Sequence, residues 1–254
     1  MYRLVADSFL KHSYAVAILG YRTYPDGLLQ EQLDDVEGGF RAIQKAYPLL
    51  ARPPRQHDYA GVCIMGHSSG AHVALMAMIE QAKKRLFTND GTTNRPIRFD
   101  GCVGISGVYD INHHFDYEAA RGVEELSPMK PVNGMTPDQF RDNSPVHRLK
   151  QVLQQKEGKS KEEGRLDGLI PPIALVHGME DTTVPFTSTA DAARGFRACG
   201  LSSVDEIYIG KLGHQEAVLQ LMMGGPTRER VVQWLLQQKE KGQNKTAVHV
   251  QSRL

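Results

Sequence analysis

The sequence predicts an α/β fold, with a mostly parallel sheet and helices on both of its faces. Short apolar runs typical of buried strands alternate with longer segments in which apolar residues recur every three or four positions, as in helices. Repeated alternation of this kind favours parallel strands joined by crossover helices. The chain has 254 residues and is 41% hydrophobic, which is enough for one sizeable core, so we expect a single domain over residues 1–254.

The expected elements follow one another in a simple order. The first strand is an apolar run at residues 15–20, and the first helix covers residues 29–47, where Leu33, Val36 and Phe40 share one face. Further strands are expected at residues 61–65, 99–106, 172–177 and 204–209, and further helices at residues 70–86 and 228–238.

This alternation is interrupted by an insertion between residues 111 and 168. Residues 112–149 are rich in Pro, Met, His and Asp, and we interpret them as a lid. Residues 150–168 are dense in Gln, Lys, Glu and Gly, which predicts a solvated helix or a mobile loop. The polar residues 240–254 are expected to form a flexible tail.

Charge and composition exclude several classes of protein. The chain has 30 basic and 29 acidic residues, a balance that argues against nucleic-acid binding. The apolar run at 15–19 is too short for an integral membrane segment, and Asp7 interrupts any signal-peptide layout. Cys63, Cys102 and Cys199 are odd in number and widely spaced, so we expect reduced thiols, with the first two buried. A soluble, cytoplasmic enzyme fits these features.

A candidate nucleophile lies in Gly-His-Ser-Ser-Gly at residues 66–70. Ser68 directly follows an expected strand and precedes a helix of small residues, which is the setting of a strained nucleophile elbow. The backbone N–H of Ser69 is then placed to stabilise an oxyanion. The alternative interpretation is a serine that caps a helix after a strand.

A serine hydroxyl needs a histidine base and an acid that orients it. Asp181 and His214 each follow an expected strand and complete the order Ser, Asp, His along the chain. Carboxyl ends of parallel strands are where α/β sheets place their sites. Glu180 is the alternative acid. We expect His67 to pack beside the nucleophile and His72 to pack or form a hydrogen bond.

A metal site is not expected. His113 and His114 are adjacent, but we find no carboxylate or histidine at ligand spacing from them on a regular element. The sequence therefore predicts no metal and no cofactor.

Several stretches of the chain together match one enzyme family. They are Gly-Tyr-Arg-Thr-Tyr-Pro at 20–25, Leu-Asp-Asp-Val at 33–36, Met-Gly-His-Ser-Ser-Gly-Ala-His at 65–72, Gly-Ile-Ser-Gly-Val-Tyr-Asp at 104–110, residues 172–185 and Gly213-His214. With these stretches the chain resembles the esterase branch of the α/β-hydrolase superfamily, which includes hormone-sensitive-lipase-like esterases, kynurenine formamidase-like enzymes and prenylcysteine methylesterases. The resemblance implies that Arg22 and Asp35 are structural partners.

One feature of that family is not found in the sequence. Its members carry a His-Gly-Gly motif ahead of the Tyr-Arg-x-x-Pro stretch, and the backbone amides of the motif supply half of the oxyanion hole. Residues 1–12 resemble the helix that follows this motif. We therefore expect an N-terminally truncated α/β-hydrolase fold with a gap in the sheet between residues 15–20 and 61–65.

The expected function is hydrolysis of a small-molecule carboxylic ester, of carboxylesterase or methylesterase type, through an acyl-enzyme on Ser68. Two alternatives stay open. One is amide hydrolysis of the formamidase type, because the same triad serves both bonds. The other is a truncated protein that is weakly active or non-catalytic.

Overall fold

The core of the fold is a parallel sheet. The computed structural model describes residues 3–48, 61–87, 96–157 and 169–251. Within these ranges the strands are hydrogen-bonded in the order in which they follow one another along the chain, and every pairing is parallel. The predicted α/β class is confirmed. The strands are β1 (Cys63–His67), β2 (Gly101–Ile105), β3 (Ile173–Gly178) and β4 (Val204–Ile209).

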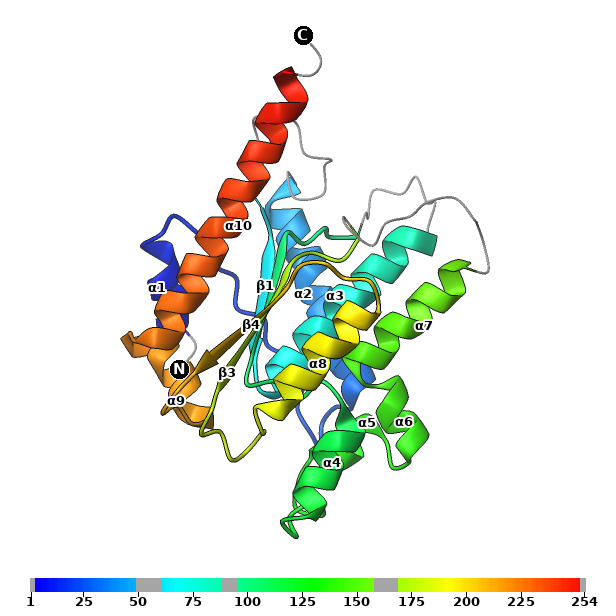
Figure 1. Ribbon diagram of the computed structural model, residues 1–254. Coiled ribbons are helices and arrows are strands. Elements are labelled where there is room, and N and C mark those ends of the chain that lie inside the picture. The colour runs from blue at the N-terminus through cyan, green and yellow to red at the C-terminus, as the bar shows by residue number, and fades with distance from the viewer. Residues whose placement is uncertain (1–2, 49–60, 88–95, 158–168, 252–254) are drawn as a thin grey trace.

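Helices cover both faces of this sheet (Figure 1). One face carries α2 (Leu29–Ala46), α3 (Ser69–Phe87), α7 (Pro145–Glu157) and α8 (Thr187–Ala198). The other carries α1 (Arg3–Leu10), α9 (His214–Met223) and α10 (Pro226–Gln251). A separate group of buried side chains fills each interface, because each face of the sheet must be covered by an apolar helix face.

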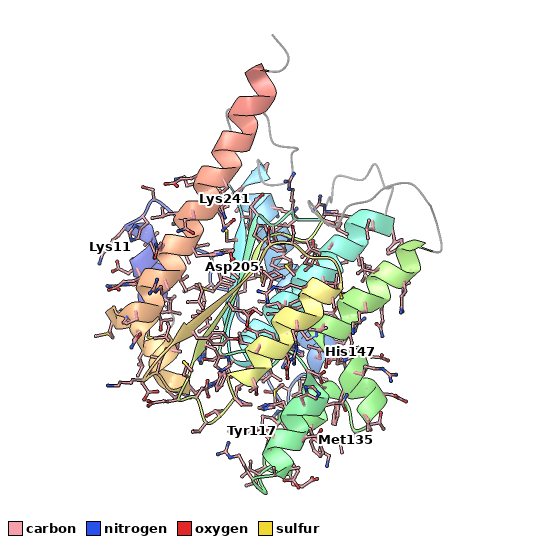
Figure 2. The ribbon with its side chains drawn as sticks, viewed as in Figure 1. Lys11, Tyr117, Met135, His147, Asp205 and Lys241 are labelled. Carbon is pink, nitrogen blue, oxygen red and sulfur yellow. The ribbon has the colours of Figure 1, made fainter. Side chains whose placement is uncertain are left out.

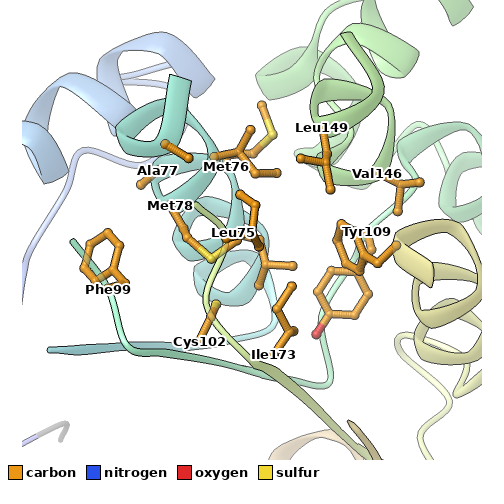
Figure 3. Close-up of a cluster of buried hydrophobic side chains, with 14 of the residues drawn as sticks. Leu75, Met76, Ala77, Met78, Phe99, Cys102, Tyr109, Val146, Leu149 and Ile173 are labelled. Carbon is orange, nitrogen blue, oxygen red and sulfur yellow. The ribbon is translucent and has the colours of Figure 1, made fainter. Parts of the chain in front are cut away.

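The larger of these two cores is centred on α3. Leu75 and Met76 from α3 belong to the same buried cluster as Leu149 from α7 and Ile173 from β3, and all four side chains are fully buried (Figure 3). The helix is buried over most of its circumference because it lies between the sheet, α2 and α7. This packing fixes the start of α3, and with it the turn that precedes the helix.

The first predicted strand is wrong. Residues 15–20 form neither helix nor strand, and Val16 and Ile18 are 38% and 50% exposed. A strand needs a hydrogen-bonded neighbour, and within the described ranges none pairs with this segment. Within the described ranges β1 pairs with β2 alone, so it is an edge strand. Cys63 on β1 is therefore exposed and not buried as predicted. Cys102 is buried on β2, and the cysteines form no disulfide.

The described part of the insertion contains four helices, of which the first three lie in the region predicted as a lid. Helices α4, α5 and α6 project beyond the sheet (Figure 1), whereas α7 packs against α3. Leu149 and Val152 are buried there. The segment predicted as a solvated helix or a mobile loop from residue 150 onward is helical as far as α7 extends, with Lys150, Gln154 and Gln155 exposed and Val152 buried. Residues 158–168 of that segment lie outside the described ranges. The lid helices are α4 (Ile111–Ala119), α5 (Met129–Asn133) and α6 (Pro137–Asp142).

The last helix is longer than predicted. It begins at Pro226, where a proline is tolerated in the first turn, and continues to Gln251. The flexible tail predicted for residues 240–254 is therefore helical as far as Gln251. Trp234 anchors the helix to the sheet by donating its indole N–H to Asp205 on β4 over 2.7 Å. In the part of the chain that is described, no helix is long and apolar enough to cross a membrane.

Arg22 and Asp35 form a two-pronged ion pair, as the family resemblance implied. Arg22 Nε and Nη2 each lie 2.9 Å from a different carboxylate oxygen of Asp35, and the Arg22 backbone N–H donates to the same group. These hydrogen bonds from Arg22 hold the pKa of Asp35 below its usual range. The pair fastens the loop after residues 15–20 to α2.

Candidate active site

The candidate nucleophile lies on a strained turn between β1 and α3. Ser68 has a φ of 55°, in the left-handed region that non-glycine residues rarely adopt. Its backbone N–H donates to the carbonyl of Ile105 on β2 over 2.9 Å, which ties the turn to the sheet. A Cβ on Gly66 would lie 2.0 Å from the carbonyl oxygen of Gly70. Only glycine at position 66 lets the chain close this turn.

The structure brings the three residues predicted for the site into one chain of hydrogen bonds. His214 Nε2 lies 2.9 Å from Ser68 Oγ, and His214 Nδ1 lies 2.7 Å from Asp181 Oδ2. Because the carboxylate can only accept, Nδ1 carries the proton and Nε2 is free to accept one from the serine hydroxyl. Of the two adjacent acids, Asp181 is buried and contacts His214, whereas Glu180 is exposed.

The carboxylate of Asp181 is held on both of its oxygens. Oδ1 accepts the backbone N–H groups of Thr183 and Val184, each over 2.9 Å, while Oδ2 faces His214. Burial would raise the pKa of Asp181, but hydrogen bonds from His177, His214 and Val184 outweigh burial and hold the pKa well below its usual range. Asp181 is therefore a fixed negative charge at neutral pH.

His67, the residue before the candidate nucleophile, contacts the candidate base His214. Its Nε2 lies 3.0 Å from the backbone carbonyl of His214, to which it donates a hydrogen bond, and the two rings are 4.8 Å apart. Burial, reinforced by the nearby His214, lowers the pKa of His67 to about 4. A neutral His67 thus anchors the loop that carries His214 and adds no competing positive charge.

Ser69 is the first residue of α3. The first N–H groups of a helix have no partner within the helix and carry its positive dipole end. The N–H of Ser69 is such a group and comes directly after the nucleophile in the chain. A position at the start of a helix, next to the nucleophile, is consistent with the predicted oxyanion role.

Helix α4 and the residues just after it, in the region predicted as a lid, are fastened to the loop that carries the acid. Tyr117 on α4 (Figure 2) donates its hydroxyl to the carbonyl of Thr182 over 2.8 Å, and Arg121 donates to the same carbonyl. The guanidinium of Arg121 also lies over the Tyr117 ring, 5.3 Å from its centroid. Movement of α4 would therefore be transmitted to the residue that follows Asp181.

A cavity of about 240 Å³ lies between α4 and the start of α8. Its walls include the carboxylates of Asp110, Asp116 and Asp191, and none of the three site residues lines it. The cavity is therefore distinct from the hydrogen-bonded triad.

The paired histidines of α4 contact acids, contrary to the sequence-based expectation. His114 Nε2 lies 3.1 Å from Glu118 Oε1, one helical turn away, so a carboxylate does occur at ligand spacing. His113 Nδ1 lies 3.6 Å from Asp191 Oδ2. Across the described ranges no three or more His, Cys, Asp or Glu side chains gather as a metal site would require.

His177 is a site residue that the sequence reasoning missed. It lies in β3, fully buried, with Nε2 only 3.3 Å from Asp181 Oδ2. Its position could have indicated this role, because His177 ends an expected strand and precedes Asp181 by four residues. His72 is buried and donates from Nδ1 to the carbonyl of Val108 over 3.0 Å, as its expected packing role allowed.

Sequence comparisons find one family and several relatives. The profile of the BD-FAE family matches residues 1–157. An isoprenylcysteine alpha-carbonyl methylesterase of Arabidopsis thaliana is 27% identical over 217 residues, which cover 85% of this chain and 47% of the relative. A probable isoprenylcysteine alpha-carbonyl methylesterase of Oryza sativa subsp. japonica is 25% identical over 230 residues, covering 91% and 51%. The chain therefore spans about half the length of these relatives.

Solved structures share the fold. Esterase B from Lactobacillus rhamnosis superimposes with a TM-score of 0.71 at 17% identity, covering 97% of this chain and 72% of that protein. A truncated carbohydrate esterase from gut microbiota gives a TM-score of 0.65 at 16% identity, covering 92% and 77%. At such low identity the likeness defines the architecture alone, which is the α/β-hydrolase fold.

Proposed function

The chain belongs to the BD-FAE family, and from that premise we propose that it hydrolyses a small-molecule carboxylic ester through an acyl-enzyme on Ser68. The observation that carries the proposal is the continuous hydrogen-bond chain from Ser68 Oγ through His214 to Asp181, with distances of 2.9 Å and 2.7 Å. Relatives named methylesterases support the ester as the substrate class.

In the first half of the reaction, His214 Nε2 takes the proton of Ser68 as Oγ attacks the ester carbonyl carbon. Asp181 stabilises the imidazolium and keeps Nδ1 protonated. The carbonyl oxygen gains a negative charge, which the N–H of Ser69 stabilises. The C–O bond to the alcohol then breaks, the alcohol takes the proton from His214, and Ser68 is left acylated.

In the second half, His214 takes a proton from water, and the resulting hydroxide adds to the acyl carbon. The bond to Ser68 Oγ breaks, and the serine regains its proton from His214. The products are one acid and one alcohol, and the protein returns to its starting state. His67 stays neutral throughout because its pKa is about 4.

The test is hydrolysis of p-nitrophenyl acetate by the wild-type protein and by Ser68→Ala. We expect the variant to lose at least ~10³-fold in kcat/KM, because no other group can form the acyl-enzyme. Ser203→Ala serves as the matched control, since Ser203 is exposed in the loop before β4. Equal rates for Ser68→Ala and the wild type would overturn the proposal.

A second arm identifies the ester. Methyl, acetyl and butyryl esters compared at equal concentration show which side of the bond the site prefers. A p-nitrophenyl phosphonate should label Ser68 in the wild-type protein with release of one p-nitrophenolate, and mass spectrometry of the labelled peptide would locate the adduct. Labelling at another residue would also contradict the proposal.

A further inference from the structure

His177 is enclosed by three elements that meet behind the candidate site. It belongs to β3 and is fully buried. Its Nδ1 lies 2.8 Å from Thr189 Oγ1 on α8, and its Nε2 lies 2.9 Å from the carbonyl oxygen of Val184. The same Nε2 lies 3.3 Å from Asp181 Oδ2. The ring therefore bridges the sheet, the helix and the loop that carries the acid.

The surroundings of this ring determine where its proton lies. Both neighbours of Nε2, the Val184 carbonyl and the Asp181 carboxylate, can only accept a hydrogen bond, so Nε2 carries a hydrogen. Nδ1 then accepts the hydroxyl hydrogen of Thr189 in a neutral ring. Each polar atom of His177 is satisfied in this one arrangement, which fixes both the tautomer and the orientation of the ring.

We propose that His177 is a positioning residue for the acid: its Nε2–H, hydrogen-bonded to the Val184 carbonyl over 2.9 Å, also lies 3.3 Å from Asp181 Oδ2, so that one carboxylate oxygen is held between two imidazoles, those of His177 and His214. The inference rests on the proposed function and adds to it a residue that acts through Asp181. Two backbone N–H groups on Oδ1 and the two imidazoles beside Oδ2 together oppose rotation of the carboxylate away from His214.

Loss of this donor would alter the base as well as the acid. Hydrogen bonds from His177 and His214 together hold the pKa of Asp181 down against burial. Without the His177 donor, more of the negative charge on Oδ2 faces His214, and its imidazolium becomes more stable. Among the described residues, Glu180 lies next to Asp181 in the chain and Glu216 lies two residues after His214, and the buried His67 at the end of β1, whose pKa is lowered to about 4, stays neutral. The acidic limb of the kcat/KM profile, which reports the base, should therefore move to higher pH.

Two amide variants distinguish the effect of the Nε2–H of His177 from the effect of the volume that its side chain fills. In His177→Gln the side-chain amide nitrogen can occupy the position of Nε2 and still donate toward Asp181. In His177→Asn the amide extends only to the position of Nδ1, near Thr189, and cannot reach the carboxylate. We expect His177→Asn to lower kcat by about 10- to 100-fold with little change in KM, because the acid loses its fixed orientation. His177→Gln should recover most of that loss.

A spectroscopic measurement tests the same contact without turnover. The hydrogen between His214 Nδ1 and Asp181 Oδ2 should give a low-field proton resonance, whose pH titration follows His214. We expect this resonance and its titration to shift in His177→Asn and to return toward the wild-type values in His177→Gln. His72→Asn is the control, since it replaces another buried histidine that has no contact with Asp181 and should leave the titration of His214 unchanged.

The outcomes distinguish this inference from the proposed function. If Ser68→Ala is as active as the wild type, the proposed function is wrong, but the resonance of His214 still tests His177. Equal losses of kcat in the Asn and Gln variants, or an unchanged His214 titration in His177→Asn, would overturn the positioning role. Thermal melts of each variant establish that folded proteins are compared.

Discussion

Replacing Asp181 with Asn would reverse the hydrogen-bond polarity of the site without changing its shape. Oδ1 accepts the N–H groups of Thr183 and Val184, so the amide oxygen of the asparagine must occupy that position. The amide NH₂ is then forced to the position of Oδ2, 2.7 Å from His214 Nδ1. A donor at that point makes Nδ1 the acceptor and moves the ring hydrogen to Nε2, which can no longer take the proton of Ser68.

The loss should be large because the wrong tautomer disables the base. We expect kcat/KM for p-nitrophenyl acetate at pH 7 to fall by about 10³- to 10⁴-fold. At about 1.4 kcal/mol for each factor of ten, this corresponds to roughly 4–6 kcal/mol of lost transition-state stabilisation. The same NH₂ would also face the Nε2–H of His177, so two donors would oppose each other.

The neighbouring acid provides a control. Glu180 precedes Asp181 and is exposed, so Glu180→Gln removes a carboxylate from the same loop and should change kcat/KM by less than about 2-fold. Circular dichroism and urea unfolding would verify that both variants fold. A folded Asp181→Asn protein that keeps kcat/KM within tenfold of the wild type would refute the tautomer reasoning.

Two further predictions concern stability. Burial lowers the pKa of His72 to about 4 from 6.5, so between these pH values the unfolded chain binds a proton that the folded chain does not, and the free energy of unfolding falls as pH falls. Urea titrations at pH 7 and pH 4 give the difference in the free energy of unfolding between the two pH values. In His72→Asn this difference should be smaller than in the wild type by about 3 kcal/mol, and equal differences in the two proteins would contradict the prediction. Gly66→Ala should cost about 3 kcal/mol or more, because the new Cβ would collide with backbone. Gly20→Ala, with nothing within 4 Å of its Cβ, should shift the urea midpoint little. Similar midpoints for the two alanine variants would show that the turn tolerates a side chain.

Local sequence pattern was sufficient for the features that depend on near neighbours. The strand at Val204–Ile209 was predicted with its observed bounds, and α2 within one residue of its observed end. Ser68 could be recognised because a strand, a glycine-flanked turn and a helix of small residues follow one another within a short stretch of chain. Asp181 and His214 could be chosen because parallel strands bring their carboxyl ends together, so a position after a strand predicts a position in space.

Features that depend on distant partners could not be predicted in this way. Residues 15–20 have the composition of a strand, but a strand is defined by hydrogen bonds to a neighbour. The polar composition of residues 150–168 predicted a solvated helix or a mobile loop; residues 150–157 are helical, but burial of Val152 depends on the packing of α7 beside α3. In both cases the deciding partner lies far away along the sequence.

The sequence by itself determined the fold class, the turn that carries Ser68 and which three residues meet in the hydrogen-bonded triad, because each of these follows from a local pattern and from the direction of parallel strands. Only the tertiary structure decided how those residues are held. His67 fastens the backbone of His214, which lies 147 residues further along the chain, and the ring of His177 is held against Asp181 by its contact with Thr189 on α8. A hydrogen bond is decided by distance and angle in three dimensions, and these exist only once the sheet has assembled.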